Sequence, residues 1–290
     1  MFLHDKKEKV LMDGEMNMKN DKKTAKKSAV KTPAKRANSL SGSQWLKNSF
    51  SIWRNLGKNT EEKKIEHPAM FTNELVSKLL ETYTTCNGEK VLDPFAGSGT
   101  TLLSSMEKNM SPIGIDINEK FKKIFTDRVS LLASNAKWEY HIDDAKNLSN
   151  VIEPESIDIC ITSPPYWNIL NRKRTAAGGA PTPYSDLKND IGNTESYEEF
   201  LSSLGQISKL IYDTLKPKSF FIINVMDLRQ KSKFYPLHMD AISEITKCSF
   251  TLDDIIIWDR QDSYNNMRPL GYPYKFIINR VHEYVLIFRK

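Results

Sequence analysis

The amino-acid sequence predicts an α/β protein built on a mostly parallel, seven-stranded sheet with helices on both faces and an antiparallel last strand. Beyond His67, short β-rich runs alternate with helical stretches, which is the pattern of parallel strands joined by crossover helices. The last two β-rich runs are joined instead by a polar, aromatic and turn-rich segment, Gln261 to Arg280, so we expect the last strand to run antiparallel. With 290 residues, the chain is long enough for one large domain with its own core.

Each element is predicted from its local composition and from the spacing of its apolar side chains. The predicted strands are Lys90 to Asp93, Pro112 to Ile117, Trp138 to Ile142, Ile157 to Thr162, Ser219 to Val225, Leu252 to Trp258 and Tyr284 to Phe288. The predicted helices are Thr100 to Asn109, Glu119 to Ser134, Ser196 to Leu215 and Leu237 to Cys248. Ligands of such sheets bind beyond the carboxyl ends of the strands, so the residues directly after each strand are candidates for chemistry.

The N-terminal part of the chain carries the whole basic excess. Of the net charge of +6, residues 1–66 contribute +8, from 16 Lys+Arg and 8 Asp+Glu, and the remainder contributes −2. Residues 1–44 lack apolar periodicity and are expected to form a basic, disordered tail, which is either an electrostatic arm for nucleic acid or a solubilising segment. From Trp45 to Leu56, apolar spacings of three and four predict a short helical element that packs on a single main domain, residues 45–290.

Cysteine usage and hydropathy exclude several classes of protein. The three cysteines, Cys86, Cys160 and Cys248, are far apart and form no C-x-x-C pair, which argues against a disulfide scaffold and a zinc site, and we expect no metal. No apolar run approaches the roughly 18 residues that a membrane span requires. The first ten residues are charged where a signal peptide is apolar. These features predict a cytoplasmic protein without a membrane partner.

A glycine-containing turn, Asp93 to Thr101, follows the first predicted strand and opens the first predicted helix. Glycines at such a position let the backbone approach a ligand closely. A phosphate-binding Walker loop has Lys directly before its Ser/Thr, but Gly99 precedes Thr100 here, and a dinucleotide fingerprint has a third small residue where Leu102 stands. A merely structural turn is the alternative that stays open.

Acids after the next two strands strengthen the interpretation as a ligand site. Asp116 ends the second predicted strand, where a carboxylate can accept hydrogen bonds from two ribose hydroxyls. Asp144 follows the third strand and could accept a hydrogen bond from an adenine amino group. Either Asp alone is more often a helix N-cap. An acid after each of three consecutive strands, together with the glycine turn, favours a ligand site over capping alone.

The fourth predicted strand ends in Thr162-Ser163-Pro164-Pro165-Tyr166-Trp167. Two prolines remove two backbone donors and stiffen the chain, and the adjacent hydroxyl and aromatic side chains favour a catalytic motif over a structural turn. Together with Phe95 to Gly99, which reads F-x-G-x-G, Ser163 to Tyr166 resembles the hallmark motifs of the amino-group DNA methyltransferases. These enzymes transfer methyl from S-adenosylmethionine to N4 of cytosine or N6 of adenine.

The resemblance covers about His67 to Lys290 and implies a Rossmann-like class I methyltransferase fold with S-adenosyl-L-methionine as the cofactor. His67 to Phe71 resembles the segment that lines the methionine part of the cofactor in this family, and it precedes the glycine turn and the catalytic motif here. The expected cofactor-binding residues are His67, Pro68, Met70, Asp93, Phe95, Ala96, Gly97, Ser98, Gly99, Thr100, Asp116, Ile117 and Asp144.

The chemistry of an exocyclic amino group explains the second motif. Its nitrogen is a poor nucleophile because the lone pair is delocalised into the ring, so acceptors must hold the N–H bonds, and no covalent nucleophile is needed. The resemblance implies that the Ser163 hydroxyl and the Pro164 carbonyl are those acceptors, that Pro165 completes the motif, and that Tyr166 stacks on a base flipped out of the duplex. Cys160 precedes the motif within the strand and is expected in the core.

The favoured activity is methylation of cytosine N4, because Ser at the first motif position is commoner in that specificity. Methylation of adenine N6 is the alternative. Further behind are a methyltransferase of RNA or of protein glutamine, which usually carries Asn where Ser163 stands, and a DNA-binding subunit that has lost activity.

Two insertions, residues 168–193 and 260–280, are expected to contact double-stranded DNA at the same sheet edge as the catalytic motif. Basic side chains suit phosphates, and Asn and Arg suit base edges. The expected DNA-binding residues are Trp167, Arg172, Lys173, Arg174, Asn265, Asn266 and Arg268, with Trp167 alternatively a core residue. A cognate restriction enzyme or a specificity subunit is the further partner that the family suggests.

Overall fold

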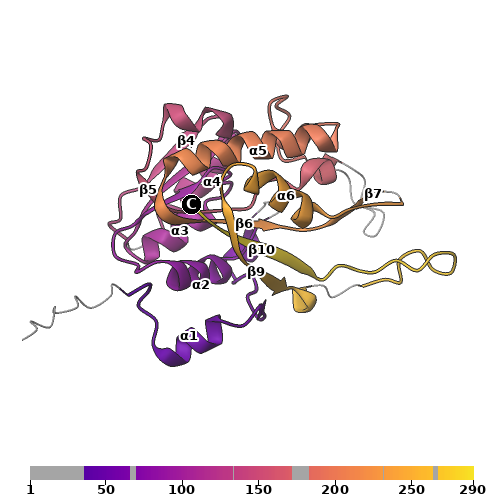
Figure 1. The fold of residues 1–290 in the computed structure, drawn as a ribbon, viewed down its shortest axis with the longest axis horizontal. Coiled ribbons are helices and arrows are strands. Elements are labelled where there is room, and N and C mark those ends of the chain that lie inside the picture. Colours follow the sequence, from indigo (N-terminus) through magenta and orange to yellow (C-terminus); the bar gives the residue numbers. More distant parts are fainter. Residues whose placement is uncertain (1–35, 66–69, 133, 172–182, 231, 264–266) are drawn as a thin grey trace, which may run out of the picture. The chain divides into compact units, whose positions relative to one another are not determined.

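The computed structural model describes residues 36–65, 70–132, 134–171, 183–230, 232–263 and 267–290. Within these ranges, one eight-stranded sheet in the order β1-β9-β10-β6-β5-β2-β3-β4 lies between helices (Figure 1). Strand β10 runs antiparallel to both of its neighbours, whereas the other neighbouring strands are parallel. The predicted Rossmann-like fold class and the antiparallel last strand are therefore confirmed.

The sheet strands are β1 (Ile52–Trp53), β2 (Lys90–Asp93), β3 (Ser111–Asp116), β4 (Glu139–Ile142), β5 (Ile157–Thr162), β6 (Leu215–Val225), β9 (Thr251–Asp259) and β10 (His282–Arg289), and β7 (Leu228–Gln230) and β8 (Lys233–Tyr235) form a separate hairpin. The α-helices are α1 (Gly42–Asn48), α2 (Asn73–Tyr83), α3 (Thr100–Glu107), α4 (Glu119–Val129), α5 (Tyr197–Thr214) and α6 (Leu237–Thr246). Short 3-10 turns are η1 (Glu62–Lys64), η2 (Ala145–Asn150), η3 (Trp167–Asn171), η4 (Ile191–Asn193) and η5 (Gln261–Ser263).

Alternation along the strands builds a core on each face of the sheet, because successive side chains of a strand point to opposite faces. Leu92 and Phe221 pack with α5 and α6, whereas their neighbours Val91 and Ile222 pack with α2. A third cluster gathers the apolar side chains of α3 and α4 around Tyr140 of β4. Burial on both faces explains why the central strands are almost continuously apolar.

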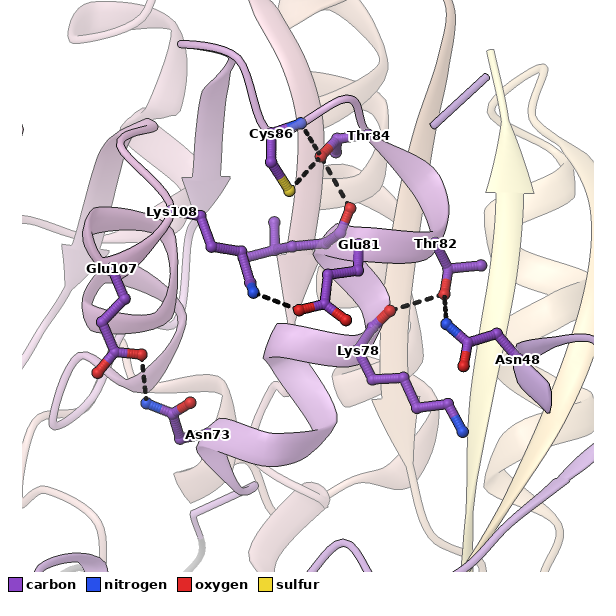
Figure 2. Close-up of polar contacts among 10 residues, drawn as sticks. Asn48, Asn73, Lys78, Glu81, Thr82, Thr84, Cys86, Glu107 and Lys108 are labelled. Atoms are coloured by element: carbon purple, nitrogen blue, oxygen red, sulfur yellow. Dashed lines mark hydrogen bonds and ion pairs between the residues drawn. The ribbon is translucent and has the colours of Figure 1, made fainter. Parts of the chain in front are cut away.

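Helix α2 was not among the predicted helices, although its apolar side chains recur at helical spacing. Thr72 caps its first turn, and the buried side chains of Leu75, Val76, Leu79 and Leu80 cover one face of the sheet. Polar contacts hold its outer side: Asn73 Nδ2 donates to Glu107 at 3.2 Å, and Lys108 Nζ lies 2.6 Å from Glu81 Oε1 (Figure 2).

The N-terminal boundary differs from the prediction. Buried Asn38 donates to the Thr82 carbonyl at 2.8 Å, and Ser41 caps α1, so packed structure begins before residue 45 and the predicted end of the tail at residue 44 is too late. Residues 1–35 lie outside the described ranges.

The predicted helical element from Trp45 to Leu56 is only partly correct. Helix α1 ends at Asn48, and Ile52–Trp53 instead form the short edge strand β1 beside β9. The side chain of Trp53 is buried, whereas Trp45, Leu46, Phe50 and Ile52 are exposed. Period-based prediction failed here because strand pairing with β9 outweighs the local helical spacing.

Candidate active site

Both sequence motifs lie where the strand order of the sheet reverses. From this point β2, β3 and β4 follow in one direction, and β5 and β6 follow in the other. Open α/β sheets bind their ligands in the crevice beyond the carboxyl ends of the strands at such a switch point. The ends of β2 and β5 are joined there by Asp93, whose carboxylate accepts hydrogen bonds from Thr101 and Thr162, each at 2.6 Å.

The turn after β2 requires glycine for two physical reasons. Gly97 and Gly99 have φ angles of 51° and 79°, in the left-handed region that other residues enter only with strain. A Cβ on Gly99 would also overlap the ring of Phe125. This turn therefore presents backbone without side chains at the start of α3, as a closely approached ligand requires.

Asp93 is fully buried, and burial raises the pKa of its carboxyl to about 6. Besides the two threonine hydroxyls, it accepts a hydrogen bond from the backbone N–H of Phe95 at 3.0 Å. Of the predicted cofactor-binding residues, Asp93 thus shapes the turn from inside the fold, with its oxygens already engaged by protein donors.

Asp116 ends β3 as predicted and faces the glycine turn. Its carboxylate accepts hydrogen bonds from the backbone N–H groups of Gly97 at 2.8 Å and Asn118 at 2.9 Å. The Tyr184 hydroxyl donates a third, at 2.6 Å. Burial raises the pKa of Asp116 to about 6, with the hydrogen bond from Tyr184 as the main opposing effect.

The other predicted cofactor residues gather around the same turn. Ser98 Oγ lies 3.1 Å from Met70 Sδ, and Ala96 N–H donates to the Ile115 carbonyl of β3 at 2.9 Å. Ala96 and Thr100 are buried, whereas Phe95 and Ile117 are partly exposed. His67 and Pro68 lie outside the described residues.

Asp144 has the capping role that the sequence left open. Its Oδ1 accepts from the Lys146 N–H at 2.9 Å and so caps η2. Its second oxygen accepts from Asn189 Nδ2 at 3.1 Å. A carboxylate has lone pairs beyond these two contacts, so capping does not exclude an adenine amino group.

Residues 183–194, which we call the strap, connect the cofactor side of the site to the catalytic motif. Tyr184 stacks on Phe121 with ring centroids 4.6 Å apart, and its carbonyl accepts from Asn118 Nδ2 at 2.7 Å. At the other end, the Thr194 carbonyl accepts from Trp167 Nε1 at 2.9 Å. The strap was predicted only as part of an insertion for DNA.

The catalytic motif follows β5 directly. Pro164 is buried, whereas Ser163, Pro165 and Tyr166 are partly exposed. Ser163 Oγ lies 3.1 Å from the Tyr166 hydroxyl and 3.4 Å from the Asn224 carbonyl of β6. A hydroxyl, a carbonyl and an aromatic ring therefore meet at the switch point, beside the glycine turn.

Sequence reasoning missed three residues behind the motif: Asn224, Arg260 and Glu283. The Tyr166 hydroxyl donates to the buried Glu283 carboxylate at 2.7 Å, and Asn224 Nδ2 donates to the same carboxylate at 2.5 Å. Arg260 forms an ion pair with Glu283. The antiparallel placement of β10 between β6 and β9 brings them together, and only a charged residue at the start of an otherwise apolar strand hinted at it in the sequence.

Trp167 is a core residue, so its predicted role in DNA contact is not supported. Its side chain is buried against Tyr197 and Tyr235, with ring centroids 5.2 and 5.1 Å away. This outcome matches the core alternative of the sequence analysis.

Residues 267–281, which we call the arm, extend away from the sheet between β9 and β10 (Figure 1). Tyr274 and Phe276 are 95% and 93% exposed, and Arg268 lies in the same exposed segment. The Arg260 N–H donates to the Val281 carbonyl at 2.7 Å, which closes the base of the arm beside Glu283. Asn265, Asn266 and Arg172 to Arg174 lie outside the described residues.

Metal-binding clusters and membrane spans are both absent from the described ranges. There, no group of three or more His, Cys, Asp or Glu side chains is arranged to hold a metal ion. None of the helices in these ranges is both long and apolar enough for a membrane span.

Several curated proteins are similar to parts of the chain. Type II methyltransferase M.MjaI of Methanocaldococcus jannaschii is 28% identical over 93 residues, which cover 32% of this chain and 30% of that protein. Type II methyltransferase M.MthZI of Methanothermobacter thermautotrophicus is 26% identical over 148 residues, which cover 49% of this chain and 41% of that protein. The matched segments thus span less than half of either relative.

Solved structures also align with the chain. A SAM-dependent methyltransferase from Methanosarcina mazei aligns at 15% identity and a TM-score of 0.45 over 70% of this chain and 92% of that one. A predicted DNA modification methylase from Thermus thermophilus, in complex with S-adenosyl-L-methionine, aligns at 26% identity and a TM-score of 0.37 over 51% of this chain and 53% of that one.

A family model for N6 and N4 methyltransferases, described as DNA methylase, matches residues 2–127 and 157–290. The two matched segments contain the glycine turn, Asp116, the motif from Ser163 to Tyr166, and Glu283. The match extends over most of the chain, so the chain belongs to this N6/N4 DNA methylase family, whose cofactor is S-adenosyl-L-methionine.

Proposed function

We propose that the chain methylates the exocyclic amino group of a DNA base, with N4 of cytosine as the favoured target and N6 of adenine as the alternative. The observation that carries the proposal is the partly exposed Ser163 hydroxyl, 3.1 Å from the Tyr166 hydroxyl at the end of β5. Its strand is tied directly to the glycine turn through Thr162 and Asp93. The acceptor for the amino group and the turn for the cofactor thus belong to one rigid unit.

The cofactor supplies an electrophilic methyl group when it is bound. For the cofactor, the glycine turn offers backbone without side chains, while Asp116 and Asp144 offer acceptors of the kind that ribose hydroxyls and an adenine amino group need. For the target base, Ser163 Oγ and the Pro164 carbonyl accept hydrogen bonds from the amino N–H groups, and Tyr166 stacks on the flipped ring. Positioning and electrostatics supply most of the rate.

Ring-carbon methylation of cytosine needs a cysteine nucleophile, and Cys160 does not suit that role. Cys160 is fully buried in β5, and burial raises the pKa of its thiol well above the ordinary value. A buried, protonated thiol is a poor nucleophile. This supports amino-group over ring-carbon chemistry.

For DNA contact, we propose the arm and the insertion that contains the strap. The arm combines Arg268, Lys275 and Arg280 with exposed aromatic rings and has no acid between residues 267 and 281. Basic and aromatic side chains together suit phosphates and unstacked bases. Arg172 to Arg174, Asn265 and Asn266 are further candidates from the sequence.

The type II methyltransferases among the relatives suggest, as a further proposal, a cognate restriction enzyme or specificity subunit as a partner. We place the protein in the cytoplasm, with its DNA substrate.

Transfer of labelled methyl from S-adenosyl-L-methionine to duplex DNA, RNA and a mixture of proteins, measured in parallel, tests the substrate class. We expect label in DNA with the wild type and none with Ser163→Ala. Glu61→Gln, at an exposed ion pair with Lys64, is the control for handling and folding and should match the wild type. Label in RNA or protein alone would replace DNA as the substrate, and no label despite cofactor binding would favour an inactive DNA-binding subunit.

A further inference from the structure

The charge of Glu283 determines which hydrogen bonds its neighbours can make. Its buried carboxylate pairs through Oε1 with Arg260, whose guanidinium also lies 4.7 Å from the centre of the Trp258 ring. An arginine is always charged, so the pair keeps Glu283 ionised. An ionised carboxylate has no hydrogen and can only accept.

The single hydrogen of the Tyr166 hydroxyl is therefore committed. It lies on the 2.7 Å bond to Glu283 Oε2, because both partners there cannot be acceptors. Asn224 Nδ2 donates to the Tyr166 oxygen at 2.8 Å and to Glu283 at 2.5 Å, so the amide supports the same direction of bonding. In its 3.1 Å contact with Ser163 Oγ, Tyr166 must then be the acceptor and Ser163 the donor.

We infer that Glu283 is a positioning residue that fixes the direction of the chain Ser163 → Tyr166 → Glu283, so that Ser163 offers only lone pairs to the target amino group. This inference rests on the proposed function. The alternative direction would turn the serine hydrogen toward the base, where it would oppose an amino N–H. An amino-group methyltransferase needs an acceptor at this point, and the buried anion behind the motif ensures it.

A purely stabilising role explains Glu283 less well. Burying a charge is costly, and a buried ion pair is often no more stabilising than apolar side chains of similar volume. The start of β10 is otherwise apolar toward the core, with Val285 and Leu286 fully buried. An anion at this position is therefore better explained by what it does to Tyr166 and Ser163.

The decisive variant is Glu283→Gln, which has nearly the same shape. Facing Arg260, the new amide turns its oxygen to the guanidinium and its NH₂ toward Tyr166, which reverses the chain. We expect kcat to fall about 100-fold, as for the loss of one transition-state hydrogen bond, while the Kd for S-adenosyl-L-methionine is unchanged. Glu283→Asp keeps the charge and should retain activity within about tenfold of the wild type. Glu61→Gln makes the same chemical change at a surface ion pair and serves as the control.

The double variant Tyr166→Phe/Glu283→Gln separates positioning from folding. Without the phenol hydroxyl, Glu283 has no link to Ser163, so the double variant should be no slower than Tyr166→Phe alone. Wild-type kcat in Glu283→Gln, equal losses in the Gln and Asp variants, or multiplicative losses in the double variant would each overturn the inference. An active wild type with an active Glu283→Gln variant rejects only this inference, whereas a wild type that transfers no methyl to DNA rejects the proposed function as well.

Discussion

At the scale of single residues, the site depends on buried carboxylates that are held by protein donors. Asp93 joins β2 to β5, Asp116 holds the glycine turn, and Glu283 lies behind the catalytic motif. The sequence predicted the first two as cofactor ligands from their positions after strands. It could not predict Glu283, because its partners Tyr166 and Asn224 are brought to it only by the order of strands in the sheet.

Gly99→Ala should lose cofactor binding and destabilise the fold. A left-handed φ costs about 1 to 2 kcal/mol for a residue with a Cβ, and the added methyl also overlaps the Phe125 ring. Gly88→Ala is the matched control, because Gly88 has the same φ of 79° with open space around its Cα. Thermal unfolding and calorimetric titration with S-adenosyl-L-methionine check both variants. Equal effects at the two sites would show that the contact with Phe125 is unimportant.

The buried carboxyl of Asp93 predicts a specific pH dependence of stability. Its pKa in the folded state is raised to about 6 from 3.8, so the folded state binds its proton more tightly than the unfolded state. Its contribution therefore favours the folded state most at low pH and is lost as pH rises from about 4 to about 6, by on the order of 2 kcal/mol. Urea unfolding at several pH values should show this loss in the wild type and not in Asp93→Asn. Parallel curves for the two proteins would contradict it.

At the scale of elements, periodicity and turn chemistry predicted the seven long strands and four of the α-helices, since each is buried on a face that its sequence pattern marks. The pattern failed for β1, which is only two residues long and exists because β9 pairs with it. It also overlooked α2 and the β7–β8 hairpin. The strap and the arm were predicted only as insertions, because loop contacts such as Tyr184 with Asp116 leave no periodic signal.

The strap predicts how cofactor binding responds to Tyr184→Phe. The Tyr184 hydroxyl donates to the Asp116 oxygen that also holds Gly97, and so competes with the ribose hydroxyls proposed to bind there. Removing it while keeping the ring on Phe121 should tighten cofactor binding about fivefold, the effect of one hydrogen bond. Tyr197→Phe, which removes a similar bond to Asp240 on α6, is the control. Weaker cofactor binding in Tyr184→Phe would make Tyr184 part of the cofactor site instead.

The arm predicts a separation of DNA affinity from cofactor affinity. Replacing Tyr274 and Phe276 by Ala removes two almost fully exposed rings that contribute nothing to the core. Stacking on a base is worth about 1 to 3 kcal/mol per ring, so the Kd for DNA should rise at least tenfold. Fluorescence anisotropy with labelled duplex checks this, with calorimetry of cofactor binding alongside. The double variant Trp45→Ala/Leu46→Ala, which removes exposed apolar side chains on α1, is the control. An unchanged Kd for DNA would place recognition elsewhere.

At the scale of the whole molecule, the charge is uneven: residues 1–66 carry +8 and the remainder −2. The catalytic part therefore has no net positive charge with which to attract DNA, and the arm is a local basic exception. Long-range attraction of DNA falls to the N-terminal residues, if they act as an electrostatic arm, whereas reading of the base belongs to the sheet edge.

The most direct test of the account is the identity of the methylated nucleoside. Wild-type protein and Ser163→Ala are incubated with S-adenosyl-L-methionine and unmethylated duplex DNA, and the digested product is analysed by mass spectrometry. The account predicts N4-methylcytosine from the wild type and none from the variant, and N6-methyladenine would keep the mechanism and change only the target base. Methylation at C5 of cytosine, or full activity of Ser163→Ala, would contradict an amino-group transfer that depends on this hydroxyl.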